Sequence, residues 1–145
     1  MTGVQTCALP IYTSDEWIVQ RTGIRARHRA AEDETVFSLG RDALRKALDR
    51  AGIAADQLDM IIVASVSGEM LCPSTAARIS EAVGADDAAV FDLAAACSGF
   101  LYGMNMADTM IRCGRAERIA VIGVDNLRSR KAAEKIGRAS CRERV

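Results

Sequence analysis

The order of apolar and polar residues predicts a chain of alternating helices and strands. Over residues 33–51 ("DETVFSLGRDALRKALDRA") the apolar side chains recur at helical spacing. Asp33 or Thr35 can cap the start of this helix, and Gly52 stands at its usual stop. The next apolar stretch, "DMIIVASV" at 59–66, is short, nearly continuous and rich in β-branched residues. Such a run is typical of a strand that is covered on both faces of a sheet.

The same alternation continues along the rest of the chain. Residues 73–84 are expected to form a short helix, and 89–94 ("AVFDLA") a second buried strand. A helix over 98–114, ended by Gly114, and a strand over 118–125 follow. This order predicts the α/β fold class, with a parallel or mixed sheet and flanking helices. The sequence contains no G-x-G-x-x-G motif, so nothing specific supports a dinucleotide-binding fold.

Composition and charge narrow the range of functions. The 145 residues carry 19 Lys and Arg against 19 Asp and Glu, which removes any electrostatic case for nucleic acid or an acidic membrane as partner. No apolar run approaches the ~18 residues of a membrane span. Five cysteines without paired spacing fit reduced intracellular thiols, and a single histidine leaves no His/Cys cluster for a metal. We therefore expect a cytoplasmic protein without a metal.

The two ends read unlike the middle of the chain. Codons that spell "MTGVQTCALPI" (1–11), with the initiator gtg read as Met, match a common short-read sequencing adapter. Codons for "IGRASCRERV" (136–145) match the partner adapter. A genuine leader and a genuine basic tail are the alternative. We expect both strings to be adapter-derived and exclude them from fold reasoning, which leaves residues 12–135 as one partial domain.

Cys97 occupies the most informative position in the sequence. It follows three alanines at the end of the predicted strand 89–94 and precedes Ser98 and Gly99. A free cysteine is more often a small buried hydrophobe than a reagent. The turn from the carboxyl end of a strand into a helix is, however, where open α/β sheets bind ligands. Backbone N–H groups and the helix dipole favour a thiolate there, and small neighbours leave room for an acyl group. Geometry alone leaves the two alternatives open.

Two motifs together resemble β-ketoacyl-ACP synthase III, a family of the thiolase-like superfamily that starts fatty-acid chains. They are "TSDEWIVQRTGIRARH" (13–28) and "DLAAACSGF" (92–100), and the similarity runs through nearly all of residues 12–130. The resemblance implies that Cys97 accepts an acyl group from acyl-CoA as a thioester. Decarboxylation of malonyl-ACP then yields a carbanion that attacks this thioester and forms 3-oxoacyl-ACP. Residues 12–135 would be a partial N-terminal thiolase-like domain.

The resemblance also implies a coenzyme A site around Trp17. The matching tryptophan stacks on the adenine, Thr13 lies where a threonine meets that base, and Arg21 matches an arginine that meets the CoA phosphates. An indole and a guanidinium suit a nucleotide. Without the resemblance, a core tryptophan and a solvated basic face are the favoured interpretations. His28 is best interpreted as a surface residue. Acyl-CoA is expected as substrate, and no cofactor is expected.

The sequence departs from the family pattern in several places. The family's first strand is missing ahead of "TSDEW", and its catalytic histidine and asparagine belong to a second half that this chain lacks. No Cys–His–Asn triad can be completed, so the chain alone is expected to be inactive. Cys72 stands where close relatives often carry a phenylalanine that shapes the partner subunit's acyl pocket. The parent protein is expected to be a homodimer.

Two alternative functions stay open. The first is another initiating ketosynthase of the same superfamily, which would make polyketides or condense two acyl chains. The second is a non-catalytic acyl-binding or dimerisation module in which Cys97 is structural. Alkylation of Cys97 no faster than that of Cys113 would favour this second alternative.

Overall fold

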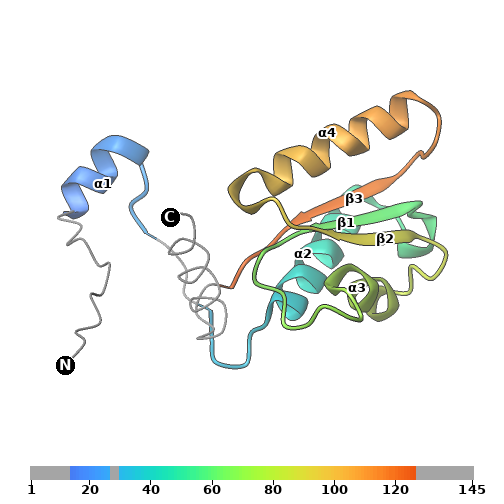
Figure 1. Cartoon of the computed structure of the whole chain (residues 1–145), viewed down its shortest axis with the longest axis horizontal. Helices are drawn as coiled ribbons and strands as arrows, with labels where there is room; N and C mark the ends of the chain where they lie inside the picture. The colour runs from blue at the N-terminus through green and yellow to red at the C-terminus, as the bar shows by residue number, and fades with distance from the viewer. Residues whose placement is uncertain (1–13, 27–29, 127–145) are drawn as a thin grey trace, which may run out of the picture.

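The computed structural model describes residues 14–26 and 30–126 and shows a parallel sheet between two layers of helices (Figure 1). The described residues form three strands, β1 (Met60–Ala64), β2 (Ala89–Leu93) and β3 (Ile119–Gly123). Their order is β2-β1-β3, so the first strand in sequence is central, and both pairings are parallel. The predicted α/β class is confirmed, and each strand lies within its predicted range.

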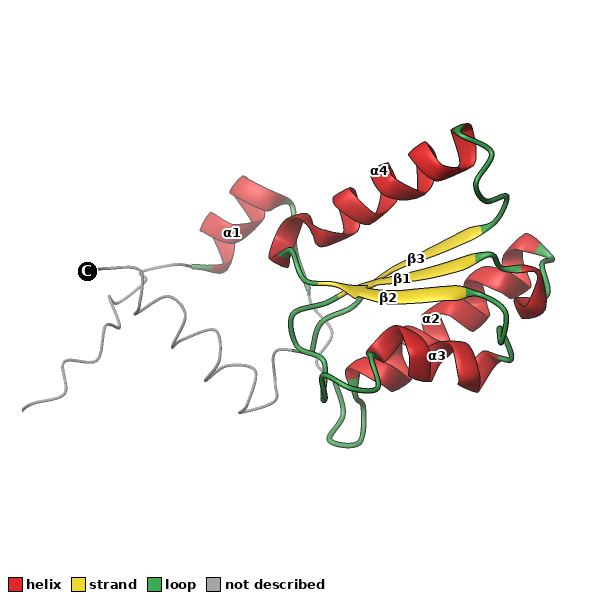
Figure 2. Ribbon diagram, turned by 45° about the vertical axis from the view of Figure 1, so that its right-hand side comes forward, coloured by secondary structure: helices red, strands yellow, loops and turns green. Residues whose placement is uncertain are grey.

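The helices lie on both faces of this sheet. Helices α2 (Val36–Ala51) and α3 (Thr75–Val83) pack on one face, and α4 (Gly99–Arg112) crosses the other (Figure 2). Helix α1 (Asp15–Thr22) lies apart from these layers, and short 3-10 turns occupy Ala55–Gln57 (η1) and Ala96–Ser98 (η2). Because both pairings are parallel, the carboxyl ends of all three strands lie at the same end of the sheet.

Local capping explains where α2 begins and ends. The Ser38 N–H donates to Thr35 Oγ1 (3.0 Å), and the Thr35 N–H donates to Ser38 Oγ (2.9 Å), which completes a capping box. Gly52, with a φ of 64°, takes the left-handed conformation that ends the helix. Of the two predicted caps, Thr35 is therefore the one that acts, and Asp33 lies outside the helix.

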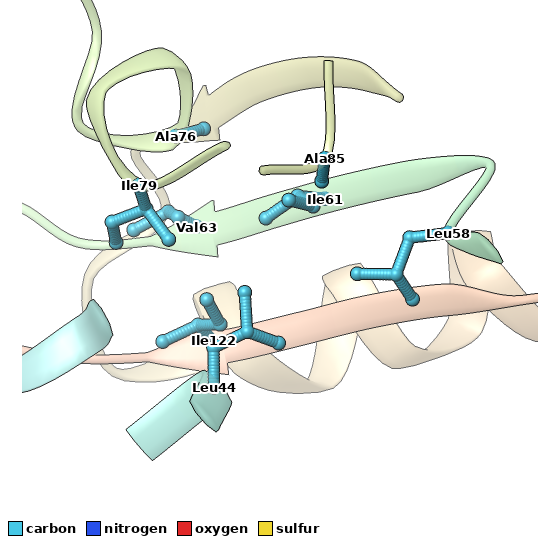
Figure 3. Close-up of a cluster of buried hydrophobic side chains, with 8 residues drawn as sticks. All are labelled: Leu44, Leu58, Ile61, Val63, Ala76, Ile79, Ala85 and Ile122. Carbon is cyan, nitrogen blue, oxygen red and sulfur yellow. The ribbon is translucent and has the colours of Figure 1, made fainter. Parts of the chain in front are cut away.

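The hydrophobic core lies mainly between the sheet and the α2–α3 layer (Figure 3). Ile61, Ile62 and Val63 of β1 are 0% exposed, as the apolar run at 59–66 predicts. Burying each such side chain contributes roughly 1.5–3 kcal/mol. The alternation of a strand then directs them to opposite layers. The buried cluster on the α2–α3 side comprises Leu44, Leu58, Ile61, Val63, Ala76, Ile79, Ala85 and Ile122.

The strand predicted at 89–94 is present, but the prediction that it is buried is wrong. No residue of β2 is buried, and Ala89 and Asp92 are exposed. Within the part of the chain that the structure describes, β2 pairs only with β1 and so forms an edge of the sheet. Helix α4 contacts mainly β1 and β3, so one face of β2 is poorly covered. The apolar residues of β2 are typical of a strand that is covered on both faces, but the described residues do not cover both.

Candidate active site

The predicted strand–turn–helix at Cys97 is present. Strand β2 ends at Leu93, η2 spans Ala96–Ser98, and α4 begins at Gly99. Cys97 lies inside the 3-10 turn, two residues before α4, on the turn between strand and helix where the sequence placed it. Its side chain is exposed. The thiol is therefore open to an incoming reagent, and the interpretation of Cys97 as a buried hydrophobe does not fit this structure.

The residue before the cysteine has a strained backbone. Ala96 has a φ of 45° and is, among the described residues, the only non-glycine residue with a positive φ. A left-handed alanine costs about 1–2 kcal/mol, because its Cβ crowds the following carbonyl oxygen. Such strain persists only where the surroundings enforce it, and it is concentrated at functional sites. The run of alanines at 94–96 indicated a sharp turn, but no sequence signal indicated this conformation.

The two backbone donors that follow the thiol are occupied. The Ser98 N–H donates to the Ala95 carbonyl oxygen (3.1 Å), and the Gly99 N–H donates to the Ala96 carbonyl oxygen. Within residues 14–26 and 30–126, the N–H of Cys97 itself donates to no backbone acceptor outside regular helix and strand hydrogen bonds. An exposed thiol beside an uncommitted N–H can attack a carbonyl carbon and hold the oxyanion that forms.

Glycine allows α4 to begin close to the sheet. A Cβ on Gly99 would lie 3.2 Å from the Ala64 Cβ, at the carboxyl end of β1. The Ser65 N–H donates to the Leu93 carbonyl oxygen (3.2 Å), and the Val124 N–H donates to the Ala64 carbonyl oxygen (3.1 Å). The turn that carries Cys97 is thus anchored at the carboxyl ends of the three strands. This is the end of the sheet at which α/β proteins bind ligands.

A carboxylate from the end of β3 organises the neighbouring loop, which sequence reasoning missed. Asp125 Oδ1 accepts hydrogen bonds from Ser65 Oγ (3.2 Å), the Val66 N–H (2.9 Å) and Ser67 Oγ (2.7 Å). Ser67 Oγ in turn accepts from the Asn126 N–H (2.9 Å). The available signal was a polar residue directly after the apolar runs of β1 and β3, namely Ser65 and Asp125. Because β1 and β3 are neighbours only in the folded sheet, the pairing could not be inferred from the sequence.

Trp17 and Arg21 lie together on α1, but away from the candidate nucleophile. The Arg21 guanidinium carbon is 5.2 Å from the centre of the Trp17 ring, and the indole is 48% exposed. Ser14 caps this helix by accepting the Trp17 N–H (3.2 Å). None of the hydrogen bonds, ion pairs or ring contacts among the described residues joins α1 to the turn at Cys97. The exposed pair excludes Trp17 as a core residue in this structure.

The remaining candidates are spread over the molecule. Cys72 is exposed beside Leu71, which is 95% exposed, and Cys113 is exposed at the end of α4. Thr13 and His28 lie outside the described residues. Within 14–26 and 30–126 no group of three or more His, Cys, Asp or Glu side chains is placed to hold a metal ion. No helix in those same ranges is both long and apolar enough to cross a membrane.

Comparison with known proteins identifies relatives for most of the chain. A family model described as 3-oxoacyl-[acyl-carrier-protein (ACP)] synthase III matches residues 91–136, which include the Cys97 turn. The β-ketoacyl-[acyl-carrier-protein] synthase III of Sodalis glossinidius is 52% identical over 115 residues, covering 79% of this chain and 36% of that protein. The Kocuria rhizophila protein of the same name is 47% identical over 117 residues, covering 81% and 33%.

Solved structures show the same likeness. The 3-oxoacyl-[acyl-carrier-protein] synthase III of Aquifex aeolicus superposes with a TM-score of 0.72 at 41% identity, covering 79% of this chain and 37% of that one. The priming β-ketosynthase of the R1128 polyketide pathway also gives 0.72, at 34% identity, covering 79% and 34%. This chain therefore spans about a third of the length of its relatives.

Fold and site together first define a class. A parallel α/β sheet with an exposed cysteine on the turn after an edge strand is a thiolase-like architecture with a candidate thiol nucleophile. Within that class, the sequence and structural matches are specific. The chain belongs to the β-ketoacyl-[acyl-carrier-protein] synthase III family.

Proposed function

We propose that the whole protein to which this chain belongs condenses an acyl-CoA primer with malonyl-ACP and so starts fatty-acid synthesis. The observation that carries this proposal is the exposed Cys97 on a strained turn, inside the segment that matches the family model. Residues 12–135 would then be a partial N-terminal domain. The remaining two thirds of the protein would supply the catalytic histidine and asparagine that the resemblance implies.

Cys97 is assigned the role of nucleophile. Its sulfur attacks the thioester carbonyl of acyl-CoA, the bond to the CoA sulfur breaks, and CoA leaves as its thiol while the acyl group stays on Cys97. In this proposal the Cys97 N–H stabilises the oxyanion of that step. Malonyl-ACP then loses carbon dioxide, and its carbanion attacks the acyl-cysteine. The products are 3-oxoacyl-ACP and the free thiol.

The exposed pair on α1 is assigned to coenzyme A. Trp17 offers an indole face for the adenine, and Arg21, held beside that ring, offers a cation for the phosphates. The assignment of Thr13 to this site rests on the family resemblance alone. Acyl-CoA and malonyl-ACP as substrates, a homodimer and a cytoplasmic location complete the proposal. The unpaired edge of β2 and the exposed apolar side chains of α4 support the proposal that another protein surface packs against this chain in the whole protein.

A second function is favoured by one comparison. The R1128 priming β-ketosynthase superposes as well as the Aquifex enzyme, so the whole protein could prime polyketide rather than fatty-acid chains. Both functions use the same nucleophile. A screen of acyl donors and carrier proteins with the protein encoded by the unbroken reading frame separates them, because the fatty-acid enzyme should accept the carrier protein of fatty-acid synthesis.

The role of Cys97 is tested by Cys97→Ser in that whole protein. We expect condensation to fall by orders of magnitude, because a hydroxyl ionises far less readily than a thiol. In this chain, Cys97 should react with iodoacetamide faster than Cys113, the matched control, which is also exposed and lies at the other end of α4. Full activity of the Cys97→Ser protein would remove Cys97 from the mechanism. Equal alkylation of the two thiols would favour a structural role.

The coenzyme A site is tested by Trp17→Ala and Arg21→Ala. Each should weaken CoA binding to the whole protein by about 1–3 kcal/mol, as for a lost stacking or charge-assisted contact. Arg50→Ala, which removes an exposed arginine from the end of α2, is the control and should leave the affinity unchanged. Unchanged CoA affinity in both α1 variants would show that this segment is merely surface.

A further inference from the structure

A carboxylate on β2 reaches across to the beginning of another helix. Asp92 Oδ2 accepts the Thr75 N–H (2.8 Å), and its Oδ1 accepts the Ala76 N–H (2.7 Å). The third N–H of α3, that of Ala77, donates to Ser74 Oγ (3.1 Å). Two of the first three donors of α3 are therefore satisfied by a residue that is 16 and 17 positions away in the chain. A carboxylate at a helix N-terminus is also favoured by the helix dipole.

This contact matters for β2 because β2 is an edge strand. Among the described residues its ladder runs along β1 alone, so its carboxyl end lacks a second neighbouring strand. Besides the ladder with β1, this end is held by the hydrogen bond from the Ser65 N–H to the Leu93 carbonyl oxygen and by the two made by Asp92. Those of Asp92 involve an ionised acceptor, which makes them stronger than neutral hydrogen bonds.

The strained turn follows immediately. Ala96 lies four residues after Asp92, and its positive φ requires both flanking segments to be fixed. On the downstream side, Gly99 packs close to Ala64, and the Phe100 ring lies over Gly123, where a Cβ would be 3.1 Å from Phe100 Cδ2. On the upstream side, Asp92 is the charged anchor.

We infer that Asp92 is a positioning residue, which holds the Ala96–Cys97 turn in its strained conformation by tying the end of β2 to the N-terminus of α3. It does not touch the reacting atoms and acts through the backbone that leads to Cys97. The inference rests on the proposed function only in taking Cys97 as the group to be positioned. The effect of Asp92 on the backbone conformation of Ala96 does not depend on whether Cys97 transfers an acyl group.

The test compares Asp92→Ala with Ser74→Ala in this chain. Both variants remove capping hydrogen bonds from α3, but only Asp92→Ala releases β2. The first measurement is the three-bond HN–Hα coupling of Ala96 together with its intraresidue HN–Hα NOE, which is strong at a positive φ because the two protons lie close together. The second is the rate of alkylation of Cys97 relative to Cys113 in the same molecule.

We expect Asp92→Ala to change the Ala96 coupling to that of an ordinary extended or helical residue, and to lower the alkylation ratio by about fivefold. Ser74→Ala should leave both unchanged. An unaltered coupling in Asp92→Ala, or an equal change in Ser74→Ala, would overturn the inference, because capping of α3 alone would then explain the contact. If Cys97 is no faster than Cys113 in the unsubstituted chain, the proposed function loses support while the coupling still decides the role of Asp92.

Asp92→Asn provides the second variant should Asp92→Ala fail to fold. The amide keeps one acceptor oxygen in the same shape and loses the other, so one of the two hydrogen bonds is broken. We expect an Ala96 coupling between those of the unsubstituted chain and an unstrained residue. A coupling equal to that of the unsubstituted chain would count against Asp92.

Discussion

The two faces of the sheet differ in how completely they are covered. On the α2–α3 side the core cluster is buried, and it includes Ile61, Val63 and Ile79 at 0% exposure. On the other side, α4 buries a narrow stripe of small residues, Gly99, Gly103 and Ala107. The rest of this helix carries exposed apolar side chains: Phe100, Leu101, Tyr102, Met104, Met106 and Ile111.

The difference between the two faces lies in the surfaces of the helices that cover them. A helix that is apolar on most of its surface is usually covered on most sides, whereas α2 is amphipathic, as a surface helix should be. Apolar patches of this kind mark interaction surfaces. The outer side of α4 therefore fits the proposal that the whole protein packs a further layer against it, consistent with relatives of about three times the length. Four predictions follow this contrast between the faces, ordered by the size of the effect.

The largest effect is expected in the closed layer. Ile79→Ala removes a fully buried side chain that packs between α2, α3 and the sheet, and should lower the free energy of unfolding by about 2–5 kcal/mol. Urea denaturation followed by circular dichroism measures this change. A loss below ~1 kcal/mol would show that the α2–α3 layer is not the main core and would remove the contrast between the faces.

A smaller loss is expected where α4 approaches the sheet. In Gly103→Ala the new Cβ would lie 2.9 Å from Val121 Cγ1, a branched side chain with little freedom to move. Overpacking should cost about 1–3 kcal/mol, partly offset by the ~1 kcal/mol gain in helix propensity. Gly40→Ala is the matched control in α2. Its Cβ meets the flexible end of Ile79 at 2.8 Å, so its net cost should be smaller. A larger loss in Gly40→Ala would reverse this ranking.

The turn between α4 and β3 should make stability depend on pH. Asp59 Oδ2 accepts the N–H groups of Glu117 (2.7 Å) and Arg118 (2.8 Å), and these bonds, that of Arg118 first, lower the pKa of the Asp59 carboxyl from its ordinary 3.8. Because the folded-state pKa is the lower one, the contribution is complete above the unfolded pKa and is lost as pH falls through the folded pKa.

The measurement is the free energy of unfolding between neutral and strongly acidic pH, for the unsubstituted chain and for Asp59→Asn. The variant should be less stable at neutral pH, and the difference should shrink as the pH falls below about 4. Asp56→Asn, which removes a neighbouring carboxylate from the η1 turn just before β1, is the matched substitution for comparison. Parallel pH curves for Asp59→Asn and the unsubstituted chain would exclude this role for Asp59.

The smallest effect on stability is expected on the outer side of α4. Leu101, 68% exposed, makes few contacts to lose, so Leu101→Ser should change the free energy of unfolding by no more than ~0.5 kcal/mol. The same change should reduce self-association measured by analytical ultracentrifugation, because it interrupts the exposed apolar surface. A loss of stability comparable to that of Ile79→Ala would mean that α4 is packed on both sides within this chain.

Much of this architecture could be predicted from local sequence. The apolar periods located three helices and three strands, Thr35 and the glycines marked helix ends, and the strand–turn–helix placed Cys97 on a loop. These features depend on near neighbours in the chain, namely side-chain spacing, capping hydrogen bonds and residues that tolerate a positive φ. The helix at Asp15–Thr22 was not predicted, because its apolar residues show little amphipathic periodicity.

The rest was decided by tertiary structure. Only the folded sheet places β1 in the centre and β2 at the edge, which is why two runs that were both predicted to be buried differ in burial. Likewise, Asp92 meets α3 and Asp125 meets the loop after β1 through contacts between residues far apart in the chain. A sequence pattern indicates that an apolar segment has to be buried or that a polar side chain has to be hydrogen-bonded. Which neighbour supplies the contact depends on strand order and on the packing of helices across the sheet, and these arise only when all the layers assemble.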